Sequence, residues 1–175
     1  KNNWDTQWRA ALQRDLQAHD QRLAAEMERI AARLDALLAA TQPKDDALIE
    51  LASRQPLVRH AFLLDASGAM VFPPVARHEL LSTMDGEFLQ RTASVWSSGL
   101  PLGGGTVAED AKLKSASQPA SGWHVWFYGD GPQWIFWKRL ASGVTLGVEV
   151  ERAAMFAALI ARSESGADDP QNSRV

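Results

Sequence analysis

A helical segment without interruption opens the chain and constrains its fold more than any other feature. Neither proline nor glycine occurs between Lys1 and Gln42, and a stripe of mostly apolar residues recurs at intervals of three or four. The stripe consists of Trp8, Leu12, Leu16, His19, Leu23, Met27, Ile30, Leu34 and Leu37. Such a stripe, held for about four heptads, predicts one helix over residues 4–40 that packs as a coiled coil or along another long element.

This helix is longer than the rest of the chain requires. At roughly 1.5 Å per residue it spans about 55 Å. The whole chain has 175 residues, which suits one domain with a core of its own. We therefore expect part of the helix to project towards a membrane or a partner subunit. The alternative is a packed helix that is broken once.

Turn and capping residues divide the middle of the chain into short elements. Asp45 and Asp46 predict the N-cap of a helix over 47–53, which Gln55-Pro56 ends. Apolar runs at 58–64 and 69–72 flank the sequence DASG and predict a hairpin in which Gly68 takes a positive φ. A further helix is predicted over 76–98. The stretch 99–122, rich in glycine and serine, predicts a long loop of the kind that forms lids or binding loops.

The last third predicts an antiparallel meander followed by a helix. Strands at 123–128, 133–140 and 144–150 are separated by the turn sequences GDGP and ASG, and a helix over 151–163 follows. The predicted fold class is α+β. A five-stranded antiparallel sheet carries the long N-terminal helix on one face, and the 76–98 helix and the long loop on the other.

Aromatic residues concentrate on the first two strands of the meander. Because side chains alternate along a strand, one face is expected to be a large core and the other a polar and aromatic surface. The residues on the second face include His124, Trp126, Tyr128, Trp137 and Arg139. They offer the apolar walls and the polar groups of a small-ligand site, in which Arg139 would hold a carboxylate. The alternative is that the tryptophans only pack beneath the helix and the loop.

The order of elements resembles the PDC or Cache family, the PAS-like extracellular sensor domains of bacterial histidine kinases, chemoreceptors and diguanylate cyclases. The resemblance is carried by the long helix, by LASRQPLVRHAFLLDASGAMVFPP at 51–74 and by GWHVWFYGDGPQWIFWKRLASGVTLGVEVERAAMFAALI at 122–160. Family members have a similar short helix, then a strand, D-x-x-G and a second strand. The resemblance implies that the first and last strands lie side by side. The Tyr, Arg, Trp and Asp set of the amino-acid-binding members has no counterpart string here, so amino-acid binding is not carried over.

The resemblance also implies a function. It implies a periplasmic, ligand-sensing domain of a membrane-bound signal transduction protein such as the sensor histidine kinase of a two-component system, with membrane spans outside this chain. The implied organisation is a signalling helix over 1–42, a sensor core over 43–163 and a polar linker over 164–175 that leads to a second lobe or a membrane span. The alternative is a non-enzymatic coiled-coil interaction module that binds a partner protein.

The long helix is also expected to join two copies of the chain. Its stripe extends beyond the length that the domain can cover, which favours a parallel homodimer. The residues expected at this interface are Trp8, Leu12, Leu16, His19 and Leu23.

Composition and motifs argue against other functions. The chain has no cysteine and a formal net charge of -3, so nothing indicates thiol chemistry or a nucleic-acid surface. It contains no nucleophile-elbow, zinc-protease, P-loop or Rossmann motif. The histidines His19, His60, His78 and His124 form no short metal-ligand pair. We therefore expect no catalytic residue, no cofactor and no metal.

Overall fold

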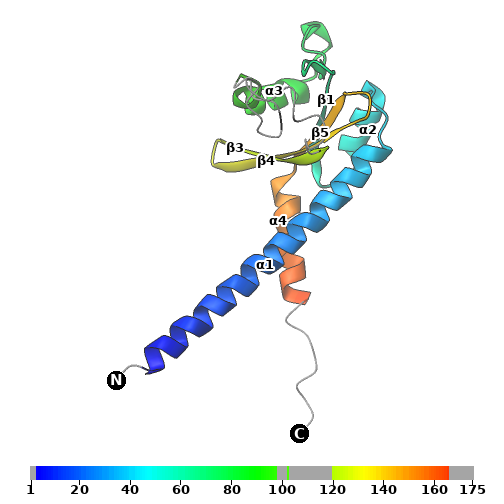
Figure 1. The fold of residues 1–175 in the computed structure, drawn as a ribbon. Helices are drawn as coiled ribbons and strands as arrows, with labels where there is room; N and C mark the ends of the chain where they lie inside the picture. Colours follow the sequence, from blue (N-terminus) through cyan, green and yellow to red (C-terminus); the bar gives the residue numbers. More distant parts are fainter. Residues whose placement is uncertain (1–2, 98–101, 103–119, 166–175) are drawn as a thin grey trace, which may run out of the picture.

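A five-stranded antiparallel sheet is at the centre of the computed structural model, which describes residues 3–97, 102 and 120–165 (Figure 1). Two helices, α1 (Asn3–Ala40) and α2 (Asp45–Arg54), precede the strands β1 (Val58–Leu64) and β2 (Met70–Phe72). A 3-10 turn, η1 (His78–Leu80), and α3 (Thr83–Ser97) follow. The meander consists of β3 (Ser121–Tyr128), β4 (Gly131–Arg139) and β5 (Thr145–Val150), after which comes α4 (Arg152–Ser165). The predicted fold class is confirmed.

The strands are ordered β2-β1-β5-β4-β3, so the first and last long strands lie side by side. The pairing of β1 with β5 runs from Val58 opposite Val150 to Leu64 opposite Thr145, as predicted. All six residues of β5 are buried, which suits a central strand covered on both faces. Gly147 faces the ring of Phe62, and a side chain at this position would collide with that ring.

Both faces of the sheet are apolar cores. The face under α1, α2 and α4 buries Phe136 and Val148 against Ile30, Leu34 and Leu38 of α1. The opposite face is covered by α3 and contains Phe62, Leu64, Phe88, Val95, Trp126, Ile135 and Trp137. Trp126 and Trp137, which were expected on a polar and aromatic surface, are therefore buried in the core beneath α3.

The expected core on the α1 face is also incomplete. Val125 is 49% exposed and Phe127 79% exposed. Both belong to β3, the edge strand, whose hairpin with β4 extends beyond the helices in Figure 1. Position at the sheet edge, which the alternation of residues does not reveal, explains this difference.

The N-terminal half of α1 continues well past the sheet (Figure 1). The single helix predicted for 4–40 is confirmed. Its C-terminal part is buried at Ile30, Leu34 and Leu38, whereas Leu12 and Leu16 are 44% and 58% exposed. Among the described residues, no helix combines the length and the apolar character that crossing a membrane requires.

Several predicted boundaries need correction. The N-cap of α2 is Lys44, and Asp45 and Asp46 lie in the first turn, where their charges suit the helix dipole. The helix expected over 76–98 begins only at Thr83, because the preceding residues form η1 and a capped turn. Gly68 does take a positive φ, of 88°. Most of the predicted 99–122 loop and of the 164–175 linker lies outside the described residues; 121–122 belong to β3 and 164–165 to α4.

Candidate functional site

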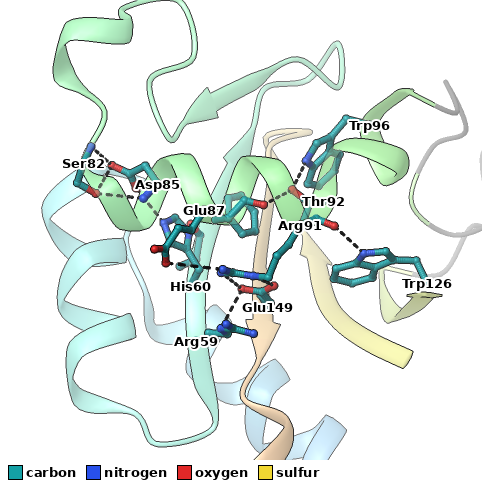
Figure 2. A network of polar contacts seen from close by, with 12 residues as sticks. Arg59, His60, Ser82, Asp85, Glu87, Arg91, Thr92, Trp96, Trp126 and Glu149 are labelled. Atoms are coloured by element: carbon teal, nitrogen blue, oxygen red, sulfur yellow. Dashed lines mark hydrogen bonds and ion pairs between the residues drawn. The ribbon is translucent and has the colours of Figure 1, made fainter. Parts of the chain in front are cut away.

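A network of largely buried polar side chains joins α3 to the sheet (Figure 2). Its members come from β1, β3, β5, α3 and the residue just before α3. The residues labelled in Figure 2 are Arg59, His60, Ser82, Asp85, Glu87, Arg91, Thr92, Trp96, Trp126 and Glu149. Because buried polar groups are costly without partners, this network decides how α3 is seated.

The first attachment lies where α3 begins. Ser82 and Asp85 form a reciprocal cap: the Ser82 backbone N–H and hydroxyl donate to Asp85 Oδ2, and the Asp85 backbone N–H donates to Ser82 Oγ. The other oxygen of Asp85, Oδ1, lies 2.9 Å from His60 Nε2 on β1. One carboxylate therefore caps the helix and also ties it to the sheet.

The environment of Asp85 favours its ionised form. Burial disfavours the charge, but the hydrogen bonds from Ser82 and the contact with His60 together outweigh burial and lower the pKa of Asp85 below its ordinary value. His60 is only 6% exposed, and its ring stacks on Phe88 with a centroid distance of 4.3 Å. The Nδ1 atom of His60 lies 2.7 Å from the carbonyl oxygen of Ala61.

The second attachment is a buried ion pair in the middle of α3. Arg91 donates from Nε and Nη2 to the two oxygens of Glu149 on β5, at 2.9 and 2.8 Å. The Glu149 side chain is 0% exposed and that of Arg91 11% exposed. The hydrogen bonds to Glu149 outweigh burial and raise the pKa of Arg91. This fork is the strong, directional form of an arginine–carboxylate pair.

A second cation, Arg59 of the neighbouring strand β1, lies near Glu149. The pairing of β1 with β5 shifts between Val58 and His60, which leaves Arg59 as the irregular residue of β1. Arg59 Nε lies 4.0 Å from Glu149 Oε1, and its side chain is 41% exposed. On the other side of the pair, Glu87 lies 4.0 Å from Arg91.

Aromatic donors complete the seating of α3. Trp126 of β3 donates from Nε1 to the carbonyl oxygen of Arg91 at 2.9 Å. Trp96 donates to the hydroxyl of Thr92, which donates in turn to the carbonyl oxygen of Phe88. Indole donors thus satisfy groups along the side of α3 that faces the sheet.

A groove lies beside the first attachment, between α2 and the start of α3. Its volume is about 510 Å³, and His60, Asp85, Ile49, Met84 and Leu80 contribute to its lining. The last three side chains are all more than half exposed. The His60–Asp85 pair is therefore buried within the protein but close to a solvent-accessible groove.

Of the five predicted ligand-site residues, the two tryptophans are part of the core. Trp126 is 7% and Trp137 1% exposed. The Nε1–H of Trp137 finds no hydrogen-bond acceptor among the described residues. The Arg139 guanidinium lies 5.5 Å from the centre of the Trp137 ring.

The remaining predicted residues do not all meet. His124 is half-buried, and burial lowers its pKa. Arg139 pairs through its backbone with Ala120, whereas Tyr128 lies opposite Gly131 at the far end of β3. Eight residues of strand separate these positions by about 25 Å. A small ligand that contacts Arg139 therefore does not reach Tyr128.

Sequence reasoning missed the network under α3, although one signal was present. Glu149 interrupts an otherwise apolar strand with the sequence TLGVEV, and a charge in a central strand calls for a buried partner. Arg91, the partner of Glu149, and Asp85, the partner of His60, are helical residues whose spacing carries no such signal, since their role depends on how α3 crosses the sheet. Within the described part of the chain, no cluster of histidine and acidic residues is arranged to hold a metal.

Comparison of the sequence and structure with protein-family models, with curated proteins and with solved structures finds no match. The geometry of the chain itself is therefore the basis from which a function is inferred. That geometry is a helix fastened to a sheet by saturated ion pairs and hydrogen bonds.

Proposed function

We propose that this chain is the extracytoplasmic sensory domain of a membrane-bound signal transduction protein, of the sensor histidine kinase type, without catalytic activity of its own. One observation carries the proposal. The sheet has α3, held by the polar network, on one face and the long projecting helix α1 on the other. A single layer of strands thus separates α3 from α1, so a change in the position of α3 has only the sheet to cross before it reaches α1.

Strand β4 supplies a direct connection between the two faces. Trp137 packs in the core under α3, whereas the next residue, Lys138, points to the opposite face and lies 2.9 Å from Asp35 of α1. Adjacent residues of a strand move together, because they share one backbone. A stimulus that reseats α3 therefore shifts the sheet against α1, and the helix passes on the movement.

The directions of α1 and α4 support a location beside a membrane. The first turns of α1 and the last turns of α4 both lie on the side away from the sheet (Figure 1). The two helices meet where Arg162 Nε lies 3.8 Å from Glu26 Oε2, beside a groove that Leu23 and Ile160 line. Helices that leave a domain on the same side suit connection to spans in one bilayer.

The projecting part of α1 supports a parallel homodimer. Leu12, Leu16 and Leu23 are 44%, 58% and 50% exposed, and isolated helices are marginal in water. The side chain of Trp8 is not among those that the structure describes, so the evidence for a dimer comes from these leucines and from His19 between them. Pairing of two copies through α1 would couple the movements of the two domains through one helical pair.

The gene around this segment tests the proposal directly. A hydrophobic span encoded just before Lys1, with a kinase or cyclase module on the far side of the membrane, is the expected result. A chain that continues into soluble domains on both sides contradicts it and favours the coiled-coil interaction module.

A biochemical test uses the full-length protein in vesicles. The Lys138→Ala variant, which removes the contact with Asp35, is expected to change output activity without unfolding the domain. Arg54→Ala is the matched control, because its exposed ion pair with Glu50 lies within α2. Equal output from both variants contradicts the proposed route through β4.

A further inference from the structure

The groove between α2 and the start of α3 gathers exposed apolar side chains in one concave place. Ile49 of α2, Leu80 of η1 and Met84 of α3 all line it, and each is more than half exposed. Exposed apolar residues that are scattered singly need no explanation, but a cluster of them is typical of a binding site. The volume of about 510 Å³ is in the range of small-molecule sites.

The groove also reaches apolar residues of the core. Leu48 of α2, Ala61 of β1 and Phe72 of β2 contribute to its lining and are buried. An apolar group in the groove therefore contacts the core as well as the exposed side chains of Ile49 and Met84. Removal of this surface from water is the main driving force for binding such a group.

The acidic side chains of the groove give it a negative charge. The carboxylates of Asp45, Asp46 and Asp85 contribute to its lining, and no described lysine or arginine does. Asp45 and Asp46 are exposed in the first turn of α2. Lys44 and Arg54 line a different groove, which Asp46 also borders. Charge complementarity therefore favours a cationic ligand.

Asp85 keeps accepting capacity in spite of its contacts (Figure 2). Ser82 donates twice to Oδ2, from its backbone N–H and its hydroxyl. Among the described residues, the other oxygen, Oδ1, meets only Nε2 of His60. A carboxylate oxygen accepts two hydrogen bonds, so Oδ1 retains a position for an N–H donor of a ligand.

We propose that this groove binds a small amphiphilic cation, an ammonium group on an apolar body, and that the bound ligand joins α2 to the start of α3. The apolar body occupies the space between Ile49, Leu80 and Met84. The ammonium group is held by the carboxylates that border this space. That such a ligand is the stimulus of a sensory domain rests on the proposed function, but the site itself does not.

The same features determine which ligands the groove prefers. A neutral molecule with the same apolar body gains burial but no ion pair. An anion with that body is repelled by the carboxylates. The expected order of affinity is therefore cation, neutral molecule and anion.

Titration of the 175-residue chain with octylammonium, octanol and octanoate, followed by NMR of the backbone amides, tests the site. Saturable shifts are expected for the amides of α2 and of residues 80–85. Octylammonium is expected to bind about fivefold more tightly than octanol, the effect of a few partly exposed ion pairs. Octanoate is expected to bind more weakly than either.

Two variants separate the contribution of charge from that of the apolar wall. Asp45→Asn combined with Asp46→Asn is expected to lower the affinity for octylammonium about fivefold and to leave that for octanol unchanged. Ile49→Ser is expected to lower the affinity for both ligands by a similar factor. Val71→Ser removes a half-exposed apolar side chain outside the groove, and this matched control is expected to change neither affinity.

Three results overturn the proposal. The first is the absence of saturable shifts in α2 and residues 80–85 with octylammonium. The second is equal affinity of the unsubstituted chain for octylammonium and octanol. The third is a set of shifts confined to another groove, such as the one between α1 and α4 that Leu23 and Ile160 line.

The sensory role is tested separately from the site. The titrations use the chain in solution, and output activity is measured with the full-length protein in vesicles. Octylammonium is expected to change that output. A site that binds octylammonium in the isolated chain, in a full-length protein whose output it leaves unchanged, would contradict the sensory role alone.

Discussion

At the scale of single residues, Glu149 is the feature that the rest of the site depends on. Its side chain is 0% exposed on a central strand, and the bidentate contact with Arg91 is what makes that burial tolerable. The second nearby cation, Arg59, is 41% exposed at 4.0 Å and supplies much less. The middle of α3 is thus held on the sheet mainly by one helical arginine.

Substitution of Arg91 by Ala is expected to lower the free energy of unfolding by about 3–5 kcal/mol, because it leaves the Glu149 charge buried without its main partner. The double substitution Arg91→Met with Glu149→Leu removes both charges and is expected to recover most of this loss. Urea unfolding followed by circular dichroism measures both. Arg59→Ala is the control, with an expected loss of less than about 1 kcal/mol, and an equal loss in Arg59→Ala contradicts the assignment.

Asp85 gives the domain a defined sensitivity to strong acid. Its pKa is lower in the folded protein than its ordinary value of 3.8, so its carboxylate stabilises the fold above that value and loses this effect as the pH falls through the lower, folded value. Asp85→Asn is therefore expected to be less stable than the unsubstituted chain at about pH 5. The difference is expected to shrink towards about pH 2 in urea unfolding. A difference that stays constant over this range contradicts the prediction.

Residue patterns predicted the aromatic strands but not their role. Alternation correctly placed Trp126 and Trp137 on one face, yet whether that face is open or covered depends on α3, which is distant in sequence. The ligand-site prediction therefore combined Arg139 and Tyr128, which the strand register separates. His60, in contrast, stood in a buried strand with no sequence signal for its helical partner.

At the scale of elements, the periodic spacing of apolar residues was sufficient to predict most helices and strands. The stripe of α1, the hairpin turn with Gly68 and the three strands of the meander were all predicted to within a few residues. The start of α3 was not, since Ser82 forms its cap with Asp85 and the pattern before it still appeared helical. Local capping chemistry, rather than apolar spacing, decides where this helix begins.

The two halves of α1 are expected to respond differently to the same substitution. Leu34 is 0% exposed in the core, so Leu34→Ala is expected to cost about 2–5 kcal/mol of unfolding free energy. Leu16 is 58% exposed, and Leu16→Ala is expected to change the stability of the monomer by less than about 0.5 kcal/mol. Thermal or urea unfolding in dilute solution measures both. A comparable loss at Leu16 indicates that the projecting half of α1 packs within its own domain.

At the scale of the whole molecule, α1 is the element that extends beyond one domain. Its C-terminal part belongs to the core through Ile30 and Leu38, and its N-terminal part presents the exposed leucines. This division makes the helix rigid at one end and available for pairing at the other. Under the proposed function, a tilt of the core would displace the N-terminal end of α1 by more than the core itself moves.

Disulfide cross-linking tests the proposed dimer, because the chain has no cysteine of its own. Leu16→Cys, on the stripe, is expected to cross-link efficiently to itself when the chain is tethered by its N-terminus to vesicles, since a parallel pair places identical residues together. Arg14→Cys, two residues away and off the stripe, is the matched control. Equal cross-linking at both positions contradicts a defined helix pair.

The pairing of β1 with β5 also determines when the sheet can fold during synthesis of the chain. β1 ends at Leu64, and its partner β5 begins only at Thr145, so in a growing chain the edge of β1 that faces β5 stays unpaired until most of the described domain has been synthesised. Sheets that close through such distant segments fold slowly and late. The hairpin of β1 and β2 alone is too small to be stable, since two isolated strands are marginal in water. Folding of the sheet is therefore coupled to the synthesis of β5, and a truncation before β5 is expected to yield a chaperone substrate rather than a smaller domain.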